Sequence, residues 1–271
     1  MIAFPNCKIN LGLKIISRRD DGYHNISTVF YPVGLTDMLE IVEAENRIFS
    51  FASGGIKVGG DTESNLCVKA YRLMKEKYHI PAIKIYLHKA IPHGAGLGGG
   101  SSDATFTVRL INEIFDLKLS ISELTDTVNC LGSDCAFFIH NKPIIAYGRG
   151  NVFKDVSLSL KGYYIIIIFP GIQISTAEAY SNVNFSGGIH QEIDVSEIDT
   201  TEWSRYLGND FEDFAFNKYP LLSKIKEILF SFGADYASMS GSGSAIFGLF
   251  KKKPDLNKIR LDYHMWQGLL A

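Results

Sequence analysis

Apolar and polar residues alternate over positions 7–15, which is the pattern of a β-strand with two unlike faces. The odd positions are apolar, and the even positions carry Lys8, Asn10, Gly12 and Lys14. Successive side chains of a strand point to opposite faces, so Lys8 and Asn10 are expected side by side, opposite the apolar face. From this strand alone, a solvent-exposed polar face is the simplest interpretation.

Further strands are expected wherever alternation or a continuous apolar run lies between turn residues. Residues 83–87 alternate before Pro92, and residues 163–169 form an unbroken apolar run that ends at Pro170 and Gly171. An unbroken run is typical of a strand that is buried on both faces. The other predicted strands cover residues 25–33, 38–43, 142–150, 236–240 and 245–250.

Helices are expected where apolar residues recur at spacings of three and four. One such series is Ala104, Val108, Ile111 and Phe115, and we expect Ser101 or Ser102 to be the N-cap of its helix. Another helix is predicted directly after Ser64, which would be its N-cap. Further predicted helices cover residues 120–131, 220–232 and 258–266.

Two helix starts carry the spacing of a capping box, at Ser120 with Glu123 and at Ser175 with Glu178. Between residues 186 and 201 the chain is polar and has no clear period, which predicts a surface loop.

The most informative stretch is IPHGAGLGGGSSDAT at residues 91–105, where five glycines fall within seven residues. Glycine adopts positive φ and lets backbone N–H groups converge on one point. The serines and the aspartate that follow are typical of a helix start, where unpaired N–H groups and the helix dipole favour an anion. The order of strand, glycine loop and helix therefore predicts a phosphate-binding site.

Other nucleotide-binding loops fit this stretch less well. A Walker A loop ends in Gly-Lys followed by Ser or Thr, and the chain has no Gly-Lys dipeptide. Gly94, Gly96 and Gly99 match G-x-G-x-x-G, but residues 120–131 form a predicted helix where a dinucleotide fold needs a strand ending in an acidic residue. The V-A-I-K and H-R-D motifs of protein kinases are absent from the sequence.

Composition favours a small-molecule partner. The 271 residues are enough for two domains, and 27 basic against 29 acidic residues give a net charge of −2, which argues against nucleic-acid binding. Neither a membrane span nor a signal peptide is expected, so we predict a cytoplasmic protein. The spacing of the cysteines and histidines suggests neither a disulfide framework nor a transition-metal site.

Five motifs in order carry a resemblance to a known family. They are P-x-x-K-x-N-L-x-L at residues 5–13, GYH at 22–24, PHGAGLGGGSSDAT at 92–105, LGSDCAFF at 131–138 and SGSGSAIF at 240–247. Together they closely resemble the superfamily of galactokinase, homoserine kinase, mevalonate kinase and phosphomevalonate kinase. Within it, the chain is most similar to the branch that phosphorylates a cytidine-diphosphate-linked methylerythritol. The resemblance spans nearly the whole chain.

The resemblance implies an α+β fold of two domains. Residues 1–150 would form an N-terminal ATP-binding and catalytic domain like domain 2 of ribosomal protein S5. Residues 151–271 would form a ferredoxin-like C-terminal domain, and a boundary near Gly150 is compatible with this because a new buried strand follows it.

The resemblance also implies a role for individual residues. Lys8 and Asp134 match the catalytic pair, and Asn65 and Lys89 match positions that line the adenosine pocket. The glycine loop would wrap the phosphates of ATP through Pro92, His93, Gly94, Ala95, Gly96, Leu97, Gly98, Gly99, Gly100, Ser101 and Ser102.

The resemblance also implies which residues would bind the acceptor substrate. Tyr23 and Tyr180 would flank the cytosine ring of the cytidyl substrate, His24 would bond its edge, and Asn10 and Thr176 would lie near the methylerythritol and diphosphate. Mg²⁺ is expected with ATP, held by phosphates and a serine hydroxyl, because the sequence shows no carboxylate dedicated to it.

Some motif positions depart from the family pattern. Cys7 stands where alanine is usual, Ala95 replaces a glycine, and Gly-Ser-Gly-Ser at 241–244 stands where Gly-Thr-Gly-Ala is common. All are exchanges of small residues, so they affect the geometry around ATP more than the reaction.

Alternative functions are a sibling kinase of another small alcohol, an RNA-binding module and a dinucleotide-dependent dehydrogenase. Tyr23, His24 and Tyr180 would bind a nucleotide base. They argue against the sibling kinases, whose acceptor alcohols carry no base. Balanced charge argues against RNA, and the missing acidic strand end argues against a dehydrogenase. We expect a monomer or weak homodimer with no nucleic-acid or membrane partner.

Overall fold

The computed structural model describes residues 1–57, 59–183, 195, 198–255 and 263–271. Contacts divide the chain into two compact units. The first contains residues 1–7, 35–93 and 98–142, and the second contains residues 8–34, 94–97 and 143–271. The units are groups of mutual contacts, and the division of the chain into domains 1–150 and 151–271 stays a prediction.

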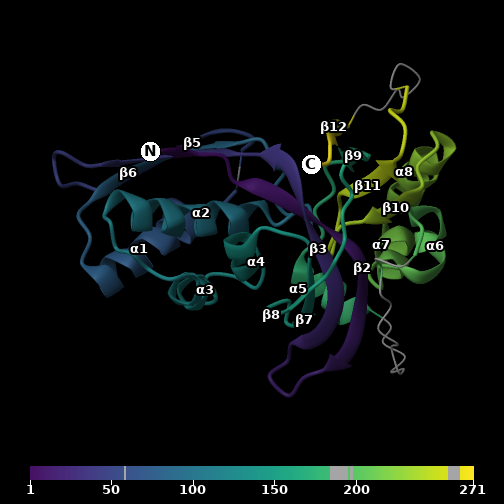
Figure 1. Ribbon diagram of the computed structural model, residues 1–271, viewed down its shortest axis with the longest axis horizontal. Coiled ribbons are helices and arrows are strands. Elements are labelled where there is room, and N and C mark those ends of the chain that lie inside the picture. The colour runs from purple at the N-terminus through teal and green to yellow at the C-terminus, as the bar shows by residue number, and fades with distance from the viewer. Residues whose placement is uncertain (58, 184–194, 196–197, 256–262) are drawn as a thin grey trace. The chain divides into compact units, whose positions relative to one another are not determined.

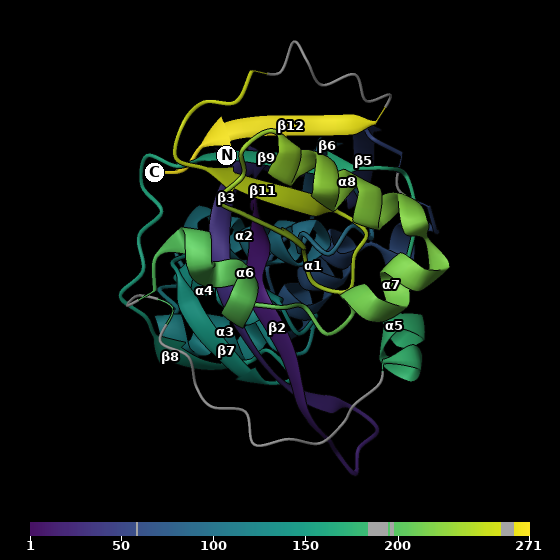
Figure 2. The same ribbon diagram turned by 90° about the vertical axis from the view of Figure 1, so that its right-hand side faces the viewer.

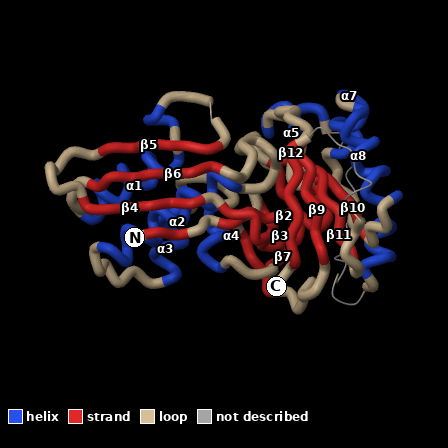
Figure 3. Tube along the Cα trace, turned by 90° about the horizontal axis from the view of Figure 1, so that it is seen from above, coloured by secondary structure: helices blue, strands red, loops and turns tan. Residues whose placement is uncertain are grey.

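The first unit is built on a sheet whose strand order is β1-β4-β6-β5. β4 pairs antiparallel with β1 and β6, whereas β5 pairs parallel with β6. A parallel pair needs a crossover connection, and helix α1 supplies it. Figures 1 and 3 show α1 and α2 together on one side of this sheet. The strands are β1 (Ile2–Ala3), β4 (Met38–Glu43), β5 (Ser50–Gly55) and β6 (Ile83–Lys89), so the strands expected at 38–43 and 83–87 are confirmed.

Three helices of the first unit are where the sequence predicts them, but two of them begin at a different residue. They are α1 (Leu66–Tyr78), α2 (Gly99–Ile114) and α3 (Ile121–Val128), and a further helix that was not predicted is α4 (Cys135–His140). The capping box of α3 between Ser120 and Glu123 is confirmed, with both of its hydrogen bonds formed.

The predicted N-caps of α1 and α2 were wrong. Asn65, and not Ser64, caps α1, because its side-chain oxygen accepts a hydrogen bond from the Cys67 N–H at 2.9 Å, while Ser64 ends a short 3₁₀ turn. The N-cap of α2 is Gly98, and not Ser101 or Ser102. Gly98 has φ +71°, a conformation that glycine adopts readily, so the helix already begins within the glycine run.

The second unit contains two sheets, with strand orders β2-β3-β7-β8 and β10-β11-β9-β12. The first sheet consists of β2 (Asn6–Arg18), whose first two residues lie in the first unit, β3 (His24–Thr36), β7 (Ile144–Gly148) and β8 (Val152–Asp155). The second sheet consists of β9 (Tyr164–Phe169), β10 (Tyr236–Met239), β11 (Ile246–Phe250) and β12 (His264–Leu269). The strands expected from the sequence in this unit are confirmed, and β9 is buried on both faces over residues 165–168.

Helices of the second unit cover the sheet that contains β9. They are α5 (Thr176–Asn182), α6 (Trp203–Tyr206), α7 (Glu212–Lys218) and α8 (Pro220–Ser231), with a 3₁₀ turn at Thr200–Glu202. The predicted helix at 220–232 is confirmed as α8, which packs on β10 and β11 (Figure 2). It can approach closely because β11 carries Gly248, where an added Cβ would lie 3.3 Å from Leu229.

Two further predictions for this unit need correction. The helix expected at 258–266 is wrong at residues 264–266, which begin β12, and residues 258–262 lie outside the described part of the chain. Pairing with the edge of β9 outweighs the local pattern there. At Ser175, the side chain accepts a hydrogen bond from the Glu178 N–H at 3.0 Å, but the Glu178 carboxylate pairs with Lys218. The loop expected at 186–201 lies mostly outside the described residues.

Candidate functional site

Lys8 and Asn10 are buried, although the sequence of β2 alone suggested a solvent-exposed face. Only 3% of Lys8 and 2% of Asn10 are exposed. The Lys8 ammonium donates to Asn10 Oδ1 at 2.7 Å and to the Gly96 carbonyl at 2.9 Å, and it lies 5.0 Å from the centre of the Phe30 ring. Asn10 in turn donates to Thr28 Oγ1 at 3.0 Å. A buried ammonium in this position can stabilise negative charge that is added nearby.

The glycine loop is divided between the two units: residues 94–97 belong to the second unit, and the loop residues before and after them belong to the first. In the second unit, Gly96 lies directly against the second glycine-serine loop at residues 240–245. The Ser240 hydroxyl donates to the Gly96 carbonyl at 2.9 Å, and the Ala245 N–H donates to the Ala95 carbonyl at 3.1 Å. Gly96 has φ +76°, and an added Cβ would lie 1.9 Å from the Ser240 carbonyl oxygen. The loop therefore depends on glycine here for conformation and for space.

In the first unit, the rest of the loop forms the start of α2. The Ser102 N–H already bonds the Gly98 carbonyl at 2.9 Å, so the N–H groups before it are the unpaired donors expected at a helix start. Those groups belong to Gly99, Gly100 and Ser101, which together with the helix dipole form a site for an anion. This agrees with the phosphate site predicted from the sequence, although the helix begins three residues earlier than Ser102.

Asp134 is the N-cap residue of α4, but its side chain makes no capping hydrogen bond. Ser133 Oγ donates to Asp134 Oδ1 at 3.4 Å. The segment is tied to the first turn of α2, because Thr105 Oγ1 bonds the carbonyls of both Ser101 and Cys135 at 2.9 Å. Helix capping, which alone would explain an aspartate here, is therefore not what Asp134 does.

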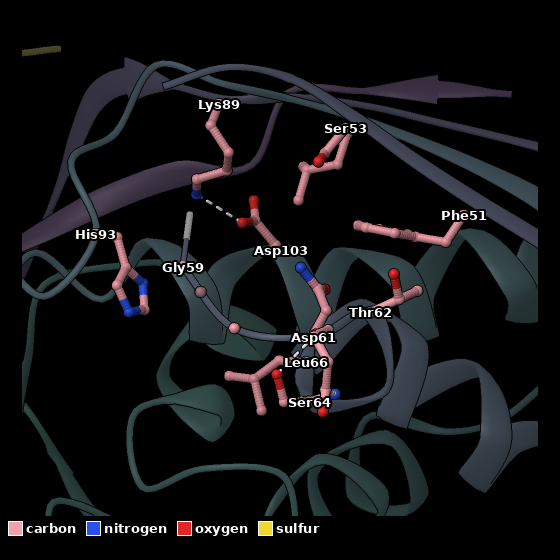
Figure 4. A pocket seen from close by; sticks show the side chains of 14 residues that line it. Phe51, Ser53, Gly59, Asp61, Thr62, Ser64, Leu66, Lys89, His93 and Asp103 are labelled. Atoms are coloured by element: carbon pink, nitrogen blue, oxygen red, sulfur yellow. Dashed lines mark hydrogen bonds and ion pairs between the residues drawn. The ribbon is translucent and has the colours of Figure 1, made fainter. Parts of the chain in front are cut away.

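Asn65 and Lys89 line one cavity of the first unit, of about 310 Å³, and the loop residues His93 and Gly100 also line it (Figure 4). Apolar surface comes from Phe51, Leu66 and Leu87. The remaining lining residues are mostly small or polar: Ser53, Gly59, Gly60, Asp61, Thr62, Ser64 and Asp103.

Lys89 is held between two buried carboxylates, which the sequence did not indicate. Its ammonium pairs with Asp103 Oδ2 at 2.7 Å and with Asp37 Oδ2, and all three side chains are at most 4% exposed. Asp37 Oδ1 accepts the N–H groups of Ala90 and Ile91 at 2.6 and 2.9 Å. This ion triad fixes the end of β6 to α2.

The surroundings of the ion triad raise the pKa values of both Asp103 and Lys89. Burial raises the pKa of Asp103 to about 7, since the attraction of Lys89 offsets only part of the burial cost and Asp37 adds repulsion. Burial also acts to lower the pKa of Lys89, but the two carboxylates outweigh it, so this pKa lies above its ordinary value. Lys89 therefore stays charged at neutral pH, while Asp103 exchanges its proton near pH 7.

Aromatic side chains of the second unit gather around Tyr180. The His24 ring stacks on Tyr180 with centroids 4.9 Å apart and an interplanar angle of 18°, and Phe211 meets Tyr180 edge to face at 4.8 Å. Burial and the charge of Arg18 lower the pKa of His24, which favours the neutral imidazole at pH 7. A base that stacks on this face of Tyr180 has to displace His24.

Tyr23 has a different neighbour. Arg149 lies 3.7 Å from the centre of the Tyr23 ring, and Tyr23 is 52% exposed. The Tyr23 N–H donates to Asp21 Oδ1 at 3.1 Å, and its carbonyl accepts the Arg19 N–H at 2.9 Å. The ring of Tyr180 thus stacks on His24, while Tyr23 pairs with Arg149.

Thr176 is the first residue of α5, and its hydroxyl lies 3.3 Å from that of Ser242 in the second glycine-serine loop. Within the second unit, the structure thus joins predicted residues in two groups. Lys8, Asn10 and Gly96 form one group, and His24 and Tyr180 form the other. Thr176 contacts the glycine-serine loop that also supports Gly96.

Asp37, Asp103, Thr28, Ser240 and Arg149 were not predicted. Asp103 belongs to the motif PHGAGLGGGSSDAT, but an aspartate after glycines and serines is also typical of a helix start. Only its burial in the structure points to a further role. Asp37 gave a usable signal as the acidic residue between two predicted strands. Arg149 gave none.

Two kinds of feature are absent from the described part of the chain. In the described ranges, no three His, Cys, Asp or Glu side chains gather closely enough to hold a metal ion. Every helix in those ranges is too short or too polar to traverse a lipid bilayer.

Two family models match the chain. The model described as GHMP kinases N terminal domain matches residues 65–142, and the one described as GHMP kinases C terminal matches residues 193–263. Among curated proteins, the chain is 49% identical over 256 residues to a 4-diphosphocytidyl-2-C-methyl-D-erythritol kinase of Cytophaga hutchinsonii, covering 94% of both chains. It is 50% identical over 262 residues to the protein of the same name from Bacteroides thetaiotaomicron, again covering 94% of both.

Solved structures agree with these matches. A crystal structure of 4-(cytidine 5'-diphospho)-2C-methyl-D-erythritol kinase has a TM-score of 0.77 at 30% identity, covering 92% of this chain and 90% of that one. A mevalonate kinase has a TM-score of 0.75 at 16% identity, which shows a shared fold. Together with the helices and strands described above, these matches establish an α+β fold of two domains.

We predict that Gly96→Ala destabilises the fold far more than Gly94→Ala. Both glycines have positive φ, but an added Cβ at Gly94 meets no atom within 4 Å, whereas at Gly96 it collides with the Ser240 carbonyl. Alanine at Gly94 should cost about 1 kcal/mol from backbone strain, and at Gly96 about 3 kcal/mol or more from strain and overpacking. Urea unfolding of both variants measures this difference. Equal losses would show that the contact between the loops contributes nothing.

Proposed function

Because the chain belongs to the GHMP kinases, and among them to the 4-diphosphocytidyl-2-C-methyl-D-erythritol kinases, we propose that it phosphorylates the 2-hydroxyl of 4-diphosphocytidyl-2-C-methyl-D-erythritol with ATP. This is an ATP-dependent phosphotransferase reaction on an alcohol, in the non-mevalonate route to isoprenoid precursors. The observation that carries the proposal is the buried Lys8 ammonium on the Gly96 carbonyl, which puts a fixed positive charge on the glycine loop.

ATP binds through its phosphates to the glycine loop in this proposal. The N–H groups at the start of α2 and the residues from Pro92 to Ser102 surround the phosphates, with the helix dipole adding to the attraction. Asn65 and Lys89 belong to the adenosine pocket, which we identify with the cavity of about 310 Å³.

Asp134 and Lys8 act on the acceptor. Asp134 orients the 2-hydroxyl and takes its proton late in the transfer. The new bond forms between the hydroxyl oxygen and the γ-phosphorus, the bond from that phosphorus to the β–γ bridging oxygen breaks, and ADP leaves. Lys8 balances the negative charge that shifts between these oxygens.

Mg²⁺ accompanies ATP in this proposal and neutralises phosphate charge. The described residues offer hydroxyls more than carboxylates to such an ion. Ser102 Oγ is buried and has no hydrogen-bond partner in the described part of the chain, so it is the serine hydroxyl best suited to this role. The phosphates of ATP would supply most of the other ligands.

The cytidyl end of the acceptor is read by the aromatic group of the second unit. Tyr180 supplies a stacking surface, His24 hydrogen-bonds the edge of the cytosine, and Tyr23, backed by Arg149, closes the other side of the ring. Asn10 and Thr176 lie toward the methylerythritol and diphosphate. We also propose that the kinase works in the cytoplasm as a monomer or weak homodimer, without a nucleic-acid partner.

A direct test compares three alcohols at equal concentration. We expect ATP consumption with 4-diphosphocytidyl-2-C-methyl-D-erythritol, and at least about 100-fold less with homoserine or mevalonate, because neither carries a base for Tyr180 and His24. Each assay is run with and without Mg²⁺, and the rate should depend on the ion. Preferred turnover of homoserine or mevalonate would replace this function with that of a sibling kinase.

Asp134→Asn should reduce turnover about 100-fold or more while ATP binding stays nearly unchanged, because the amide cannot accept the hydroxyl proton. Steady-state kinetics and calorimetric titration with ATP measure the two effects. Asp126→Asn, an exposed aspartate of α3, serves as the matched control and should behave like the parent. Near-normal turnover of Asp134→Asn would remove Asp134 from the reaction.

A further inference from the structure

Thr28 of β3 is a buried residue beside the Lys8 contact, and the proposed reaction assigns it no role. It is 4% exposed, and its hydroxyl makes two hydrogen bonds to the neighbouring strand β2. Oγ1 donates to the Gly12 carbonyl, and it accepts from the amide nitrogen of Asn10 at 3.0 Å. The hydroxyl thus joins the backbone of β2 to a side chain of the candidate site.

The hydroxyl of Thr28 has only one hydrogen to donate, and this fixes the direction of both bonds. A hydroxyl carries one O–H donor and accepts through its lone pairs. The Gly12 carbonyl is an acceptor only, so it takes the hydrogen of Thr28. Thr28 must then accept from Asn10, which means that the amide N–H₂ faces Thr28 and that Oδ1 faces the opposite way.

The oxygen oriented in this way is the one that binds Lys8. The Lys8 ammonium donates to Asn10 Oδ1 at 2.7 Å and to the Gly96 carbonyl at 2.9 Å. An ammonium is a donor only, so an amide turned by half a rotation would present N–H₂ to a cation. Lys8, Asn10 and Thr28 are each at most 4% exposed, and hydrogen bonds are electrostatically stronger at such buried places than in water.

We propose that Thr28 is a positioning residue, which holds the Lys8 ammonium in place through the amide of Asn10. This inference rests on the proposed use of Lys8 in phosphoryl transfer. The Gly12 carbonyl orients the hydroxyl, the hydroxyl orients the amide, and the amide oxygen holds the ammonium against the Gly96 carbonyl. A cation whose place is already set stabilises the transition state more than one that has to move into place.

The competing explanation is that the hydroxyl only stabilises the pairing of β2 with β3. Thr127 of α3 provides a matched control, because it is 3% exposed and its hydroxyl has the same two kinds of partner. It donates to the Glu123 carbonyl at 2.7 Å and accepts from the Lys77 ammonium at 3.2 Å. If both hydroxyls are purely structural, removing either one changes the melting temperature and leaves turnover unchanged.

The first test compares Thr28→Val, Thr28→Ser and Thr127→Val. Valine keeps the branched shape and removes the hydroxyl. The single-turnover rate, at saturating ATP and acceptor, should fall about 10-fold or more in Thr28→Val, with the ATP affinity within about 3-fold of the parent. Thr28→Ser retains the hydroxyl and should stay within about 3-fold of the parental rate.

Thr127→Val should keep the parental rate even where its melting temperature falls as much as that of Thr28→Val. A parental rate in Thr28→Val, or an equal loss of rate in Thr127→Val, would overturn the inference. Should Thr28→Val fail to fold, Thr28→Cys takes its place, since a thiol is a weak donor and acceptor, and its rate should fall in the same direction.

The second test asks whether Thr28 acts through Lys8. Thr28→Val is combined with Lys8→Met, which removes the ammonium that the amide oxygen holds. In that background, Thr28→Val should lower the single-turnover rate by less than about 2-fold, because residues that act as one unit are not additive. The same 10-fold loss with and without the ammonium would show that Thr28 acts independently of Lys8 and would overturn the inference.

A third measurement does not depend on the acceptor. A crystal structure of Thr28→Val should show the Asn10 amide turned or the Lys8 ammonium moved away from the Gly96 carbonyl, and unchanged positions of both would overturn the inference. Preferred turnover of homoserine or mevalonate would refute the proposed function alone. The rates of the same variants with that alcohol, together with this structure, would still decide the role of Thr28.

Discussion

The arrangement of the glycine loop depends on one buried contact, in which the Lys8 ammonium bonds the Gly96 carbonyl and Asn10. The Lys8 ammonium is buried away from water, which strengthens its electrostatic interactions. The Gly96 carbonyl that it bonds is also held by the Ser240 hydroxyl. Because the Gly96 carbonyl accepts hydrogen bonds from both Lys8 and Ser240, two separate segments of the second unit fix a single peptide group of the loop. The positive charge that we propose for phosphoryl transfer is thus part of the fold of the second unit.

The sequence predicts the order of elements and the glycine loop because these depend on local periodicity and on glycine. It does not predict that both faces of β2 are buried, because burial of Lys8 comes from residues far along the chain. The start of α2 is missed for a related reason, since a serine after glycines is usually a cap, yet here the glycines themselves are helical. The helix expected at 258–266 fails where pairing with β9 outweighs the apolar spacing.

The resemblance to GHMP kinases supplies the residue roles that geometry alone would not assign. It implies that Lys89 lines the adenosine pocket, which stays a proposal, and the structure adds that the charge of Lys89 is balanced by Asp37 and Asp103. A lysine in this state is a weak ligand for a base but a firm support for a carboxylate.

The charge of Lys8 is the centre of the account, and Lys8→Met tests it most directly because methionine keeps the unbranched stem and removes the ammonium. The measurement is the single-turnover rate of phosphoryl transfer to the cytidyl substrate, with ATP affinity and melting temperature determined in parallel. We predict a rate about 100-fold or more below that of the parent, with the ATP affinity changed by less than about 10-fold. A folded Lys8→Met protein that transfers the phosphoryl group at the parental rate would contradict the account.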